Sequence, residues 1–235
     1  MVSTMIHFYD TNVVIGYVYS VDPLHEASKK AILEKNDNYY SEHVKSEVKK
    51  VAFRKDREYD KFLRKVLKVI DKTNDNDLIN LSQIHSAINQ FEEIGKLTVK
   101  KMHFAIEVIW QELGFYENTD AFQVKVIFNN YLNNFNSKHM DCIDNCFNNM
   151  SCIPAYTQKN QQVLNKIKEN SLRETYLDGK DEEILFDVDE YLKNNPNIEL
   201  LFVSGDKNFI KAISILIDVL KLDKYIYLKD YLKNQ

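Results

Sequence analysis

The sequence predicts an α/β protein in which a mostly parallel β-sheet is covered by helices. At both ends of the chain, short apolar runs of strand character alternate with amphipathic helical stretches, an order that produces parallel strands joined by helices. The middle of the chain has mainly helical periodicity. With 235 residues, 44% of them hydrophobic and 28% charged, the chain can bury a sizeable core and has the composition of a soluble globular protein.

The first predicted strand covers residues 5–9 and ends at Asp10. Apolar character resumes directly after this acidic residue. The stretch VDPLHEASKKAILEK then predicts a helix, because Pro23 suits a first turn and Ala27 and Ala31 follow at helical spacing.

Tyr39–Tyr40 is the second predicted strand. Ser41 follows it as a predicted N-cap, since a serine hydroxyl can accept a backbone hydrogen bond from the first helical turn. Val44 and Val48 lie on one face of the helix that begins there, and the helical pattern continues to Ile70.

The C-terminal third has a clearer alternation of elements. We expect a helix, a strand, a Ser-Gly-Asp turn, a second helix, a last strand and a short helical tail. The first five cover residues 181–193, 199–203, 204–206, 208–221 and 225–228.

Residues 73–170 are predicted to form a mostly helical insertion, either separate or packed on the core as one domain. Residues 1–72 and 171–235 would then form the α/β core. A linker rich in proline, glycine or serine does not mark either boundary.

The composition indicates a cytoplasmic protein without a membrane partner. No apolar run approaches the ~20 residues that span a bilayer, and the N-terminus lacks the basic start and long apolar core of a signal peptide. Three cysteines, an odd and small number, do not indicate a disulfide framework.

Charge is unevenly distributed along the chain. The net charge is −4, yet residues 45–72 contain eleven basic and five acidic residues. Such a basic block can attract a polyanion, because the local field steers the ligand. A solvated helix face carrying ion pairs one turn apart explains the block equally well. The candidate nucleic-acid-binding residues are Lys49, Lys50, Arg54, Arg57 and Lys207.

Two acidic residues follow predicted strands. Asp10 comes directly after the first strand, and Asp206 follows the strand at residues 199–203. In a parallel sheet the carboxyl ends of the strands meet at one edge, where ligands bind. If these two strands are neighbours, their acidic residues lie at the same edge.

Two further acidic residues are distinguished by their position on predicted helices. At ~100° per residue, Glu47 borders the apolar stripe of its helix. Asp181 lies at the centre of the apolar face of the later helix, whereas Glu182 and Glu183 are predicted to point away from it. A buried carboxylate without a partner costs several kcal/mol, so Asp181 is expected to have one.

Each acidic residue has a structural explanation that, taken singly, is favoured. Asp10 can cap the segment that follows it, Asp206 can cap the last long helix, and Asp181 can interact with a helix N-terminus. Glu47 can pair with a lysine of its own helix. Together, however, the four acidic residues form the pattern that an all-oxygen Mg²⁺ or Mn²⁺ site requires.

Four short stretches resemble, in order, the motifs of the PIN-domain (PilT N-terminus-like) ribonuclease family: FYDTNVVIGY, SEHVKSEV, DGKDEEIL and LLFVSGDKNFI. The resemblance implies a three-layer α/β/α sandwich with a cluster of acidic residues that binds one or two Mg²⁺ or Mn²⁺ ions. It assigns the catalytic and metal-binding positions to Asp10, Glu47, Asp181 and Asp206. Candidates for supporting positions are Asn12, Asp178 and Ser204, with Asp178 also a weaker candidate for the third acidic position.

The activity implied by the resemblance is metal-dependent hydrolysis of phosphodiester bonds in single-stranded RNA. Toxin-type members of the family act with an inhibitory partner, so an antitoxin-like protein is a candidate partner, as is a second copy of the chain. The helical middle departs from the compact members. Roles in toxicity, RNA processing or defence, and endo- or exonucleolytic cleavage, all stay open.

Two other functions compete with this one. A haloacid-dehalogenase-like phosphatase also begins with a strand that ends in aspartate, but it needs a second acidic residue two positions later, where this chain has Asn12. The alternative is a non-catalytic scaffold that binds RNA and retains the fold with an incomplete metal site.

Overall fold

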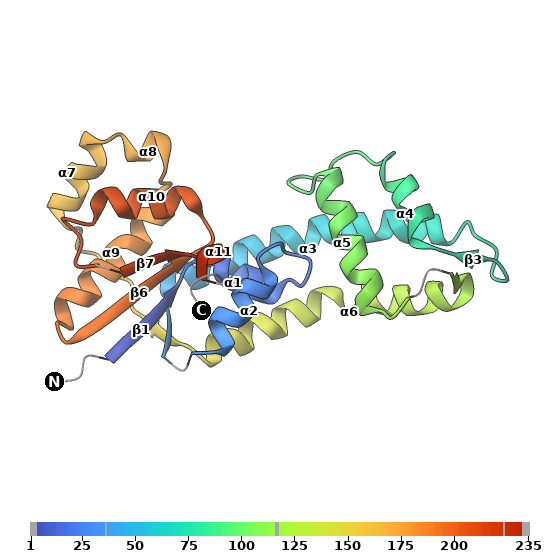
Figure 1. Ribbon diagram of the computed structural model, residues 1–235, viewed down its shortest axis with the longest axis horizontal. Helices are drawn as coiled ribbons and strands as arrows, with labels where there is room; N and C mark the ends of the chain where they lie inside the picture. Colours follow the sequence, from blue (N-terminus) through green and yellow to red (C-terminus); the bar gives the residue numbers. More distant parts are fainter. Residues whose placement is uncertain (1–3, 36, 116–117, 223, 232–235) are drawn as a thin grey trace. The chain divides into compact units, whose positions relative to one another are not determined.

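The computed structural model describes residues 4–35, 37–115, 118–222 and 224–231, and it divides into two compact units (Figure 1). The sheet unit comprises Met1–Tyr19, Pro23–Lys50 and Ile143–Gln235. The helical unit comprises Ser20–Asp22 and Val51–Cys142.

A five-stranded parallel sheet forms the centre of the sheet unit, in the order β5-β2-β1-β6-β7. Its strands are β1 (Thr4–Tyr9), β2 (Asn38–Ser41), β5 (Ser151–Ile153), β6 (Ile198–Ser204) and β7 (Lys224–Tyr227). β1 is the middle strand, and it pairs with β6 along its whole length, from Thr4 opposite Ile198 to Tyr9 opposite Val203. The two acidic strand ends predicted from the sequence therefore belong to neighbouring strands.

Helices flank this sheet, as expected for an α/β protein. They are α1 (Thr11–Val18), α2 (His25–Leu33), α7 (Gln161–Glu169), α8 (Leu172–Thr175), α9 (Gly179–Asn194), α10 (Lys207–Leu216) and α11 (Leu228–Tyr231). α9 packs against β2, β5 and β6, while α10 packs against β6 and β7. The Phe8 and Phe202 rings stack 5.2 Å apart between β1 and β6, and Phe209 of α10 meets Phe202 edge-on.

Two long helices, α3 (Glu42–Ile70) and α6 (Ala121–Asn148), contribute residues to both units. Within the helical unit they pack on each other: the Tyr59 and Phe135 rings lie 6.0 Å apart, and His139 Nδ1 lies 2.9 Å from Asp56 Oδ1. The unit also contains α4 (Leu81–Ile88), α5 (Val99–Glu112) and a short antiparallel pair, β3 (Leu78–Ile79) with β4 (Thr119–Asp120).

The observed boundaries differ from those predicted at residues 72 and 170. The helical unit begins inside α3, at Val51, and ends inside α6, at Cys142. Residues 151–153 form β5 at the edge of the central sheet, so part of the predicted insertion belongs to the core. A strand of three residues is too short to produce a readable alternation, and this explains why the sequence did not reveal it.

The elements nearest to the predicted acidic residues agree well with the sequence pattern. β1, β2, α9, β6 and β7 all occur within a few residues of their predicted positions. The Ser41 hydroxyl accepts a 3.4 Å hydrogen bond from the backbone of Val44, consistent with its predicted capping role. One difference matters for the site: a helix, α1, begins immediately after Asp10.

A helix long and apolar enough to cross a membrane does not occur in the described part of the chain.

Candidate functional site

The candidate site lies at the carboxyl edge of the sheet, where the strand order changes direction. After β1 the chain proceeds to β2 on one side, and after β6 it proceeds to β7 on the other. In open α/β sheets, the two loops diverge at such a point and leave a crevice in which ligands bind. Asp10 follows β1 and Asp206 follows β6, so both acidic residues lie at this switch point.

Asp10 is buried, with 2% of its surface exposed. Its Oδ1 accepts a 2.6 Å hydrogen bond from the Thr11 backbone, and Oδ2 accepts one of 2.7 Å from the Ser204 hydroxyl. The Asn12 amide lies 3.4 Å from the same Oδ2. Two of the predicted supporting residues, Asn12 and Ser204, therefore contact Asp10.

Glu47 of α3 is joined to the Asp10 loop through Thr11. The Thr11 hydroxyl donates a 2.8 Å hydrogen bond to Glu47 Oε2, and Lys180 Nζ lies 3.5 Å from Oε1. The Glu47 side chain is 18% exposed, in agreement with its predicted place beside the apolar stripe. Its cationic partner is Lys180 of α9, whereas the sequence suggested a lysine of its own helix.

Asp178 and Asp181 form the N-terminal capping box of α9. Asp178 accepts from the backbone of Lys180 and Asp181, and Asp181 Oδ2 accepts a 3.0 Å hydrogen bond from the Asp178 backbone. Lys180, whose backbone N–H donates to Asp178, also reaches Glu47 through its side chain. The third motif is thus connected to the second.

Asp206 is the N-cap of α10 and accepts hydrogen bonds from the backbone of Asn208 and Phe209. Its own backbone N–H donates a 2.9 Å hydrogen bond to the Ser204 hydroxyl, which in turn donates to Asp10. Ser204 is fully buried. This single hydroxyl connects the first motif to the fourth.

Mutual repulsion and burial perturb two of the acidic residues. Burial raises the pKa of Asp10 to about 6; the hydrogen bond from Ser204 opposes this shift, while the Glu47 and Asp206 carboxylates add to it. Burial also raises the pKa of Asp181 to about 7, and the charges of Asp10, Asp178 and Asp206 act in the same direction. The acidic residues of separate motifs are therefore close enough to influence one another's ionisation.

The structural explanations offered by the sequence are correct for three of the four acidic residues. Asp10 and Asp206 are N-caps, and Asp181 belongs to a capping box. Capping does not require further carboxylates nearby and gains little from them, because like charges repel. The capping role explains each position singly but not the contacts that link the four motifs.

The donor chemistry fits a hard divalent cation, although the carboxylates are not assembled around a common point. No three His, Cys, Asp or Glu side chains among residues 4–35, 37–115, 118–222 and 224–231 are arranged to hold a metal ion. Within the same residues, the hydrogen bonds to Asp181 fall on Oδ2 and those to Asp206 fall on Oδ1, which leaves Asp181 Oδ1 and Asp206 Oδ2 without one. Each carboxylate thus keeps an uncommitted oxygen of the kind that Mg²⁺ and Mn²⁺ prefer.

One sequence prediction on α9 was wrong. Glu182 was expected to point away from the core, yet it is only 4% exposed and forms a two-pronged ion pair with Arg173, at 2.5 and 2.8 Å. The helical-phase argument assumed a single buried face. α9 is instead covered on several sides, and Asp187 and Asp189 are buried as well. Glu183 is exposed, as predicted.

The sequence did not predict a histidine–carboxylate pair that joins α3 to α9. Asp187 of α9 is fully buried and lies 2.7 Å from His43 Nδ1, while its other oxygen accepts a 2.9 Å hydrogen bond from the Tyr156 backbone. His43 precedes Glu47 by one turn of α3. At ~100° per residue Asp187 lies about 120° from Asp181 around the helix, outside the predicted apolar stripe, so helical phase gave no signal for it.

The predicted nucleic-acid-binding residues divide between the units. Lys49 and Lys50 belong to the sheet unit, whereas Arg54 and Arg57 belong to the helical unit; all four are exposed on α3. Lys207 is exposed beside Asp206, and its ammonium lies 5.4 Å from the centre of the Tyr227 ring.

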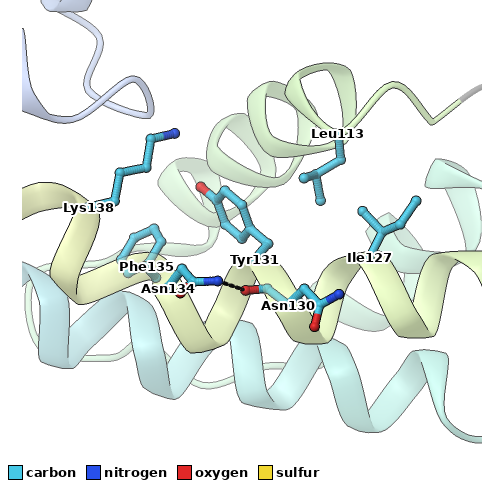
Figure 2. Close-up of a pocket in the computed structure, with 7 residues that line it drawn as sticks. All are labelled: Leu113, Ile127, Asn130, Tyr131, Asn134, Phe135 and Lys138. Atoms are coloured by element: carbon cyan, nitrogen blue, oxygen red, sulfur yellow. Dashed lines mark hydrogen bonds between the residues drawn. The ribbon is translucent and has the colours of Figure 1, made fainter.

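A pocket of about 310 Å³ lies in the helical unit and contains none of these acidic residues. Figure 2 shows Tyr131 and Phe135 of α6 with Leu113 and Lys138 around it, and the hydrogen bond from the Asn134 amide to the Asn130 carbonyl. Its lining has one charged residue, Lys138, and gives no indication of a reactive centre.

Comparisons with protein-family models, characterised proteins and solved structures gave no match to this chain.

Proposed function

We propose that the protein is a metal-dependent ribonuclease with a PIN-like fold, which hydrolyses phosphodiester bonds of single-stranded RNA at the site formed by Asp10, Glu47, Asp181 and Asp206. The proposal is supported by one chain of contacts that joins all four motifs. Asp206 is linked to Ser204 and Asp10, Thr11 links Asp10 to Glu47, and Lys180 links Glu47 to the α9 capping box.

The location of this chain of contacts adds support. It lies at the switch point between β1 and β6, the place where a parallel sheet opens a ligand crevice. A bound Mg²⁺ or Mn²⁺ would there activate a water molecule and neutralise charge on the scissile phosphate. The four carboxylates would hold the ion, with the uncommitted oxygens of Asp181 and Asp206 available as ligands without loss of a hydrogen bond.

The supporting residues have distinct tasks in this proposal. Ser204 and the Thr11 backbone orient the Asp10 carboxylate from two sides. The Thr11 hydroxyl orients Glu47. Lys180 forms an ion pair with Glu47, so it would reduce the repulsion among the carboxylates when no cation is present.

The test is cleavage of labelled single-stranded RNA in the presence of Mn²⁺, Mg²⁺ or EDTA. We expect cleavage only with a divalent cation, and a loss of at least about 100-fold in Asp10→Asn, because a ligand that also orients the site is removed. Asp144→Asn is the matched control, since Asp144 is an exposed acidic residue of the sheet unit on α6. Equal cleavage by both variants would contradict the proposal.

The competing functions give different results in the same assay. A phosphatase would hydrolyse p-nitrophenyl phosphate and leave RNA intact. The exposed Asn12 argues against this function, because such a phosphatase needs an acidic residue at position 12. A scaffold would bind RNA without cleaving it and would take up no Mn²⁺ in titration calorimetry.

A further inference from the structure

A basic groove runs along α3 in the helical unit, apart from any residue used in the proposed catalytic site. Two adjoining pockets of about 220 and 470 Å³ form it, and they share Lys61, Ile94 and Gly95 in their walls. One wall is α3, and the other is the turn at residues 93–95 between α4 and α5. We call this feature the α3 groove.

The turn is held against α3 by specific contacts. The Lys96 backbone donates a 3.2 Å hydrogen bond to Glu58 Oε1 on α3. Gly95 has a φ of +60°, and a β-carbon there would lie 2.2 Å from the same Glu58 oxygen. The second wall therefore depends on a glycine that permits both a left-handed backbone and a close approach.

The groove is strongly positive. Six basic side chains line its two pockets, against the two acidic side chains of Glu58 and Glu93; the basic ones are Arg54, Arg57, Lys61, Arg64, Lys65 and Lys68. Such an arrangement attracts a polyanion, because the local field determines steering.

Ion pairing within the helix does not account for these charges. Arg64 pairs with Asp60 one turn away. Arg54, Arg57, Lys61 and Lys68 form no ion pair with any residue of the described ranges. The alternative left open by the sequence, a solvated face neutralised by pairs one turn apart, thus applies to Arg64 alone among the six.

Aromatic side chains accompany the positive charges. Phe53 lies at one end of the groove with 72% of its surface exposed. Lys65 places its ammonium 5.5 Å from the centre of the Phe91 ring. A positive groove bordered by an exposed aromatic ring is the arrangement by which proteins bind single strands, with phosphates on the cations and a base stacked on the ring.

We propose that the α3 groove binds single-stranded RNA, with Arg54, Arg57, Lys61 and Lys68 contacting phosphates and Phe53 stacking against a base. The choice of RNA as the polymer rests on the proposed function, whereas the groove's charge and exposed ring are independent of it. From residue 54 to residue 68, α3 rises about 21 Å at 1.5 Å per residue, so the groove can accommodate several successive nucleotides.

The test is fluorescence anisotropy with labelled oligo(U) of roughly 16 nucleotides, with every protein in an Asp10→Asn background to prevent cleavage. The test variant carries Arg57→Glu, Lys61→Glu and Lys68→Glu. The control carries Lys29→Glu, Lys100→Glu and Lys168→Glu, three exposed lysines outside the groove that change the net charge equally. Thermal unfolding of both variants verifies that they are folded.

We expect the groove variant to bind at least about tenfold more weakly than the control at moderate salt. The slope of log K against log salt concentration should also become less steep by about 2, because roughly 0.7 of a counterion is released per single-strand phosphate contact. Phe53→Ala should weaken binding by about tenfold without changing this slope, since stacking releases no counterion.

Three results would overturn the proposal. The first is equal binding of RNA by the groove variant and the control. The second is tighter binding to anionic lipid vesicles than to RNA when polyglutamate is present as a competitor, and the third is a Phe53→Ala variant in which only the salt slope changes. Failure of the groove proposal can be distinguished from failure of the proposed nuclease activity. A chain that cleaves RNA but whose groove variant binds normally contradicts only the groove, whereas groove-dependent binding without metal-dependent cleavage contradicts only the nuclease.

Discussion

The Ser204 hydroxyl donates a 2.7 Å hydrogen bond to Asp10 Oδ2 across 194 residues of sequence. Both residues are buried, and the strands that carry them, β1 and β6, are paired neighbours. The same hydroxyl accepts the Asp206 backbone N–H. One serine therefore links the residues that follow the two paired strands.

Asp10→Asn should stabilise the metal-free protein at pH 8. The folded-state pKa of Asp10 is about 6, above the roughly 3.9 of an unfolded chain. Ionisation therefore destabilises the folded state, with no cost below about pH 4 and the full cost above about pH 6. Asparagine is an equally good N-cap, and its amide can donate to the Ser204 hydroxyl, which can rotate to accept it. We expect a gain of about 1–3 kcal/mol in the free energy of unfolding at pH 8 that disappears at pH 4.

Urea unfolding with EDTA measures this gain, with Asp144→Asn as the control for a lost surface charge. A loss of stability at pH 8 would show that capping and hydrogen bonding by Asp10 outweigh its burial cost. Addition of Mn²⁺ should reverse the order, because a cation bound by the wild type stabilises only the folded state that binds it.

Mn²⁺ affinity should fall as the pH is lowered from 8 to 5.5. Carboxylates bind the cation in their deprotonated form, and the pKa values of Asp10 and Asp181 are about 6 and about 7. We expect a decrease of at least about tenfold in affinity and proton release on binding. Titration calorimetry in two buffers with different ionisation enthalpies measures both. A pH-independent affinity would contradict the involvement of these two acidic residues.

Lys180→Gln should tighten Mn²⁺ binding. The Lys180 ammonium lies 3.5 Å from Glu47 Oε1, so its removal leaves the acidic residues with a more negative potential. Solvent screens this partly exposed pair, and such pairs are worth about 0.2–1 kcal/mol, so we expect a gain of up to about fivefold in affinity. Lys168→Gln, at an exposed position on α7, is the control, and a weakened affinity in Lys180→Gln would argue against this role.

Asp187→Asn should destabilise the protein by about 1–3 kcal/mol. The fully buried carboxylate accepts hydrogen bonds from His43 Nδ1 and from the Tyr156 backbone, and an amide can accept only one of them while placing a donor against the other. Glu183→Gln is a matched control on α9, because Glu183 is exposed and lies 3.7 Å from His43 Nε2. Chemical denaturation should show a change below about 0.5 kcal/mol for the control.

Gly95→Ala should cost more stability than Gly114→Ala. Both glycines have positive φ, at +60° and +70°, so alanine is strained by about 1 kcal/mol at each position. Only at Gly95 does the new β-carbon also meet Glu58 and disturb its bond to Lys96. We expect an additional loss of about 1 kcal/mol there; equal losses in thermal unfolding would show that Glu58 moves aside freely.

The sequence by itself was sufficient to predict the alternation of strands and helices at both ends of the chain, because apolar periodicity is a local property. It also predicted Asp10 and Asp206 at strand ends and Glu47 beside a buried stripe, since helical phase follows from spacing alone. The compartment, an antitoxin-like partner, a homodimer and the metal stay predictions, because none of them is a property of the chain's own contacts.

Only the tertiary structure determined which strands are neighbours, and hence that the loops after β1 and β6 diverge at one edge of the sheet. It paired Glu47 with Lys180, buried Glu182 against Arg173 and placed β5 in the sheet. These features depend on contacts between residues far apart in the sequence. The periodicity of one segment cannot encode them, because burial on a second face depends on the element that packs against it.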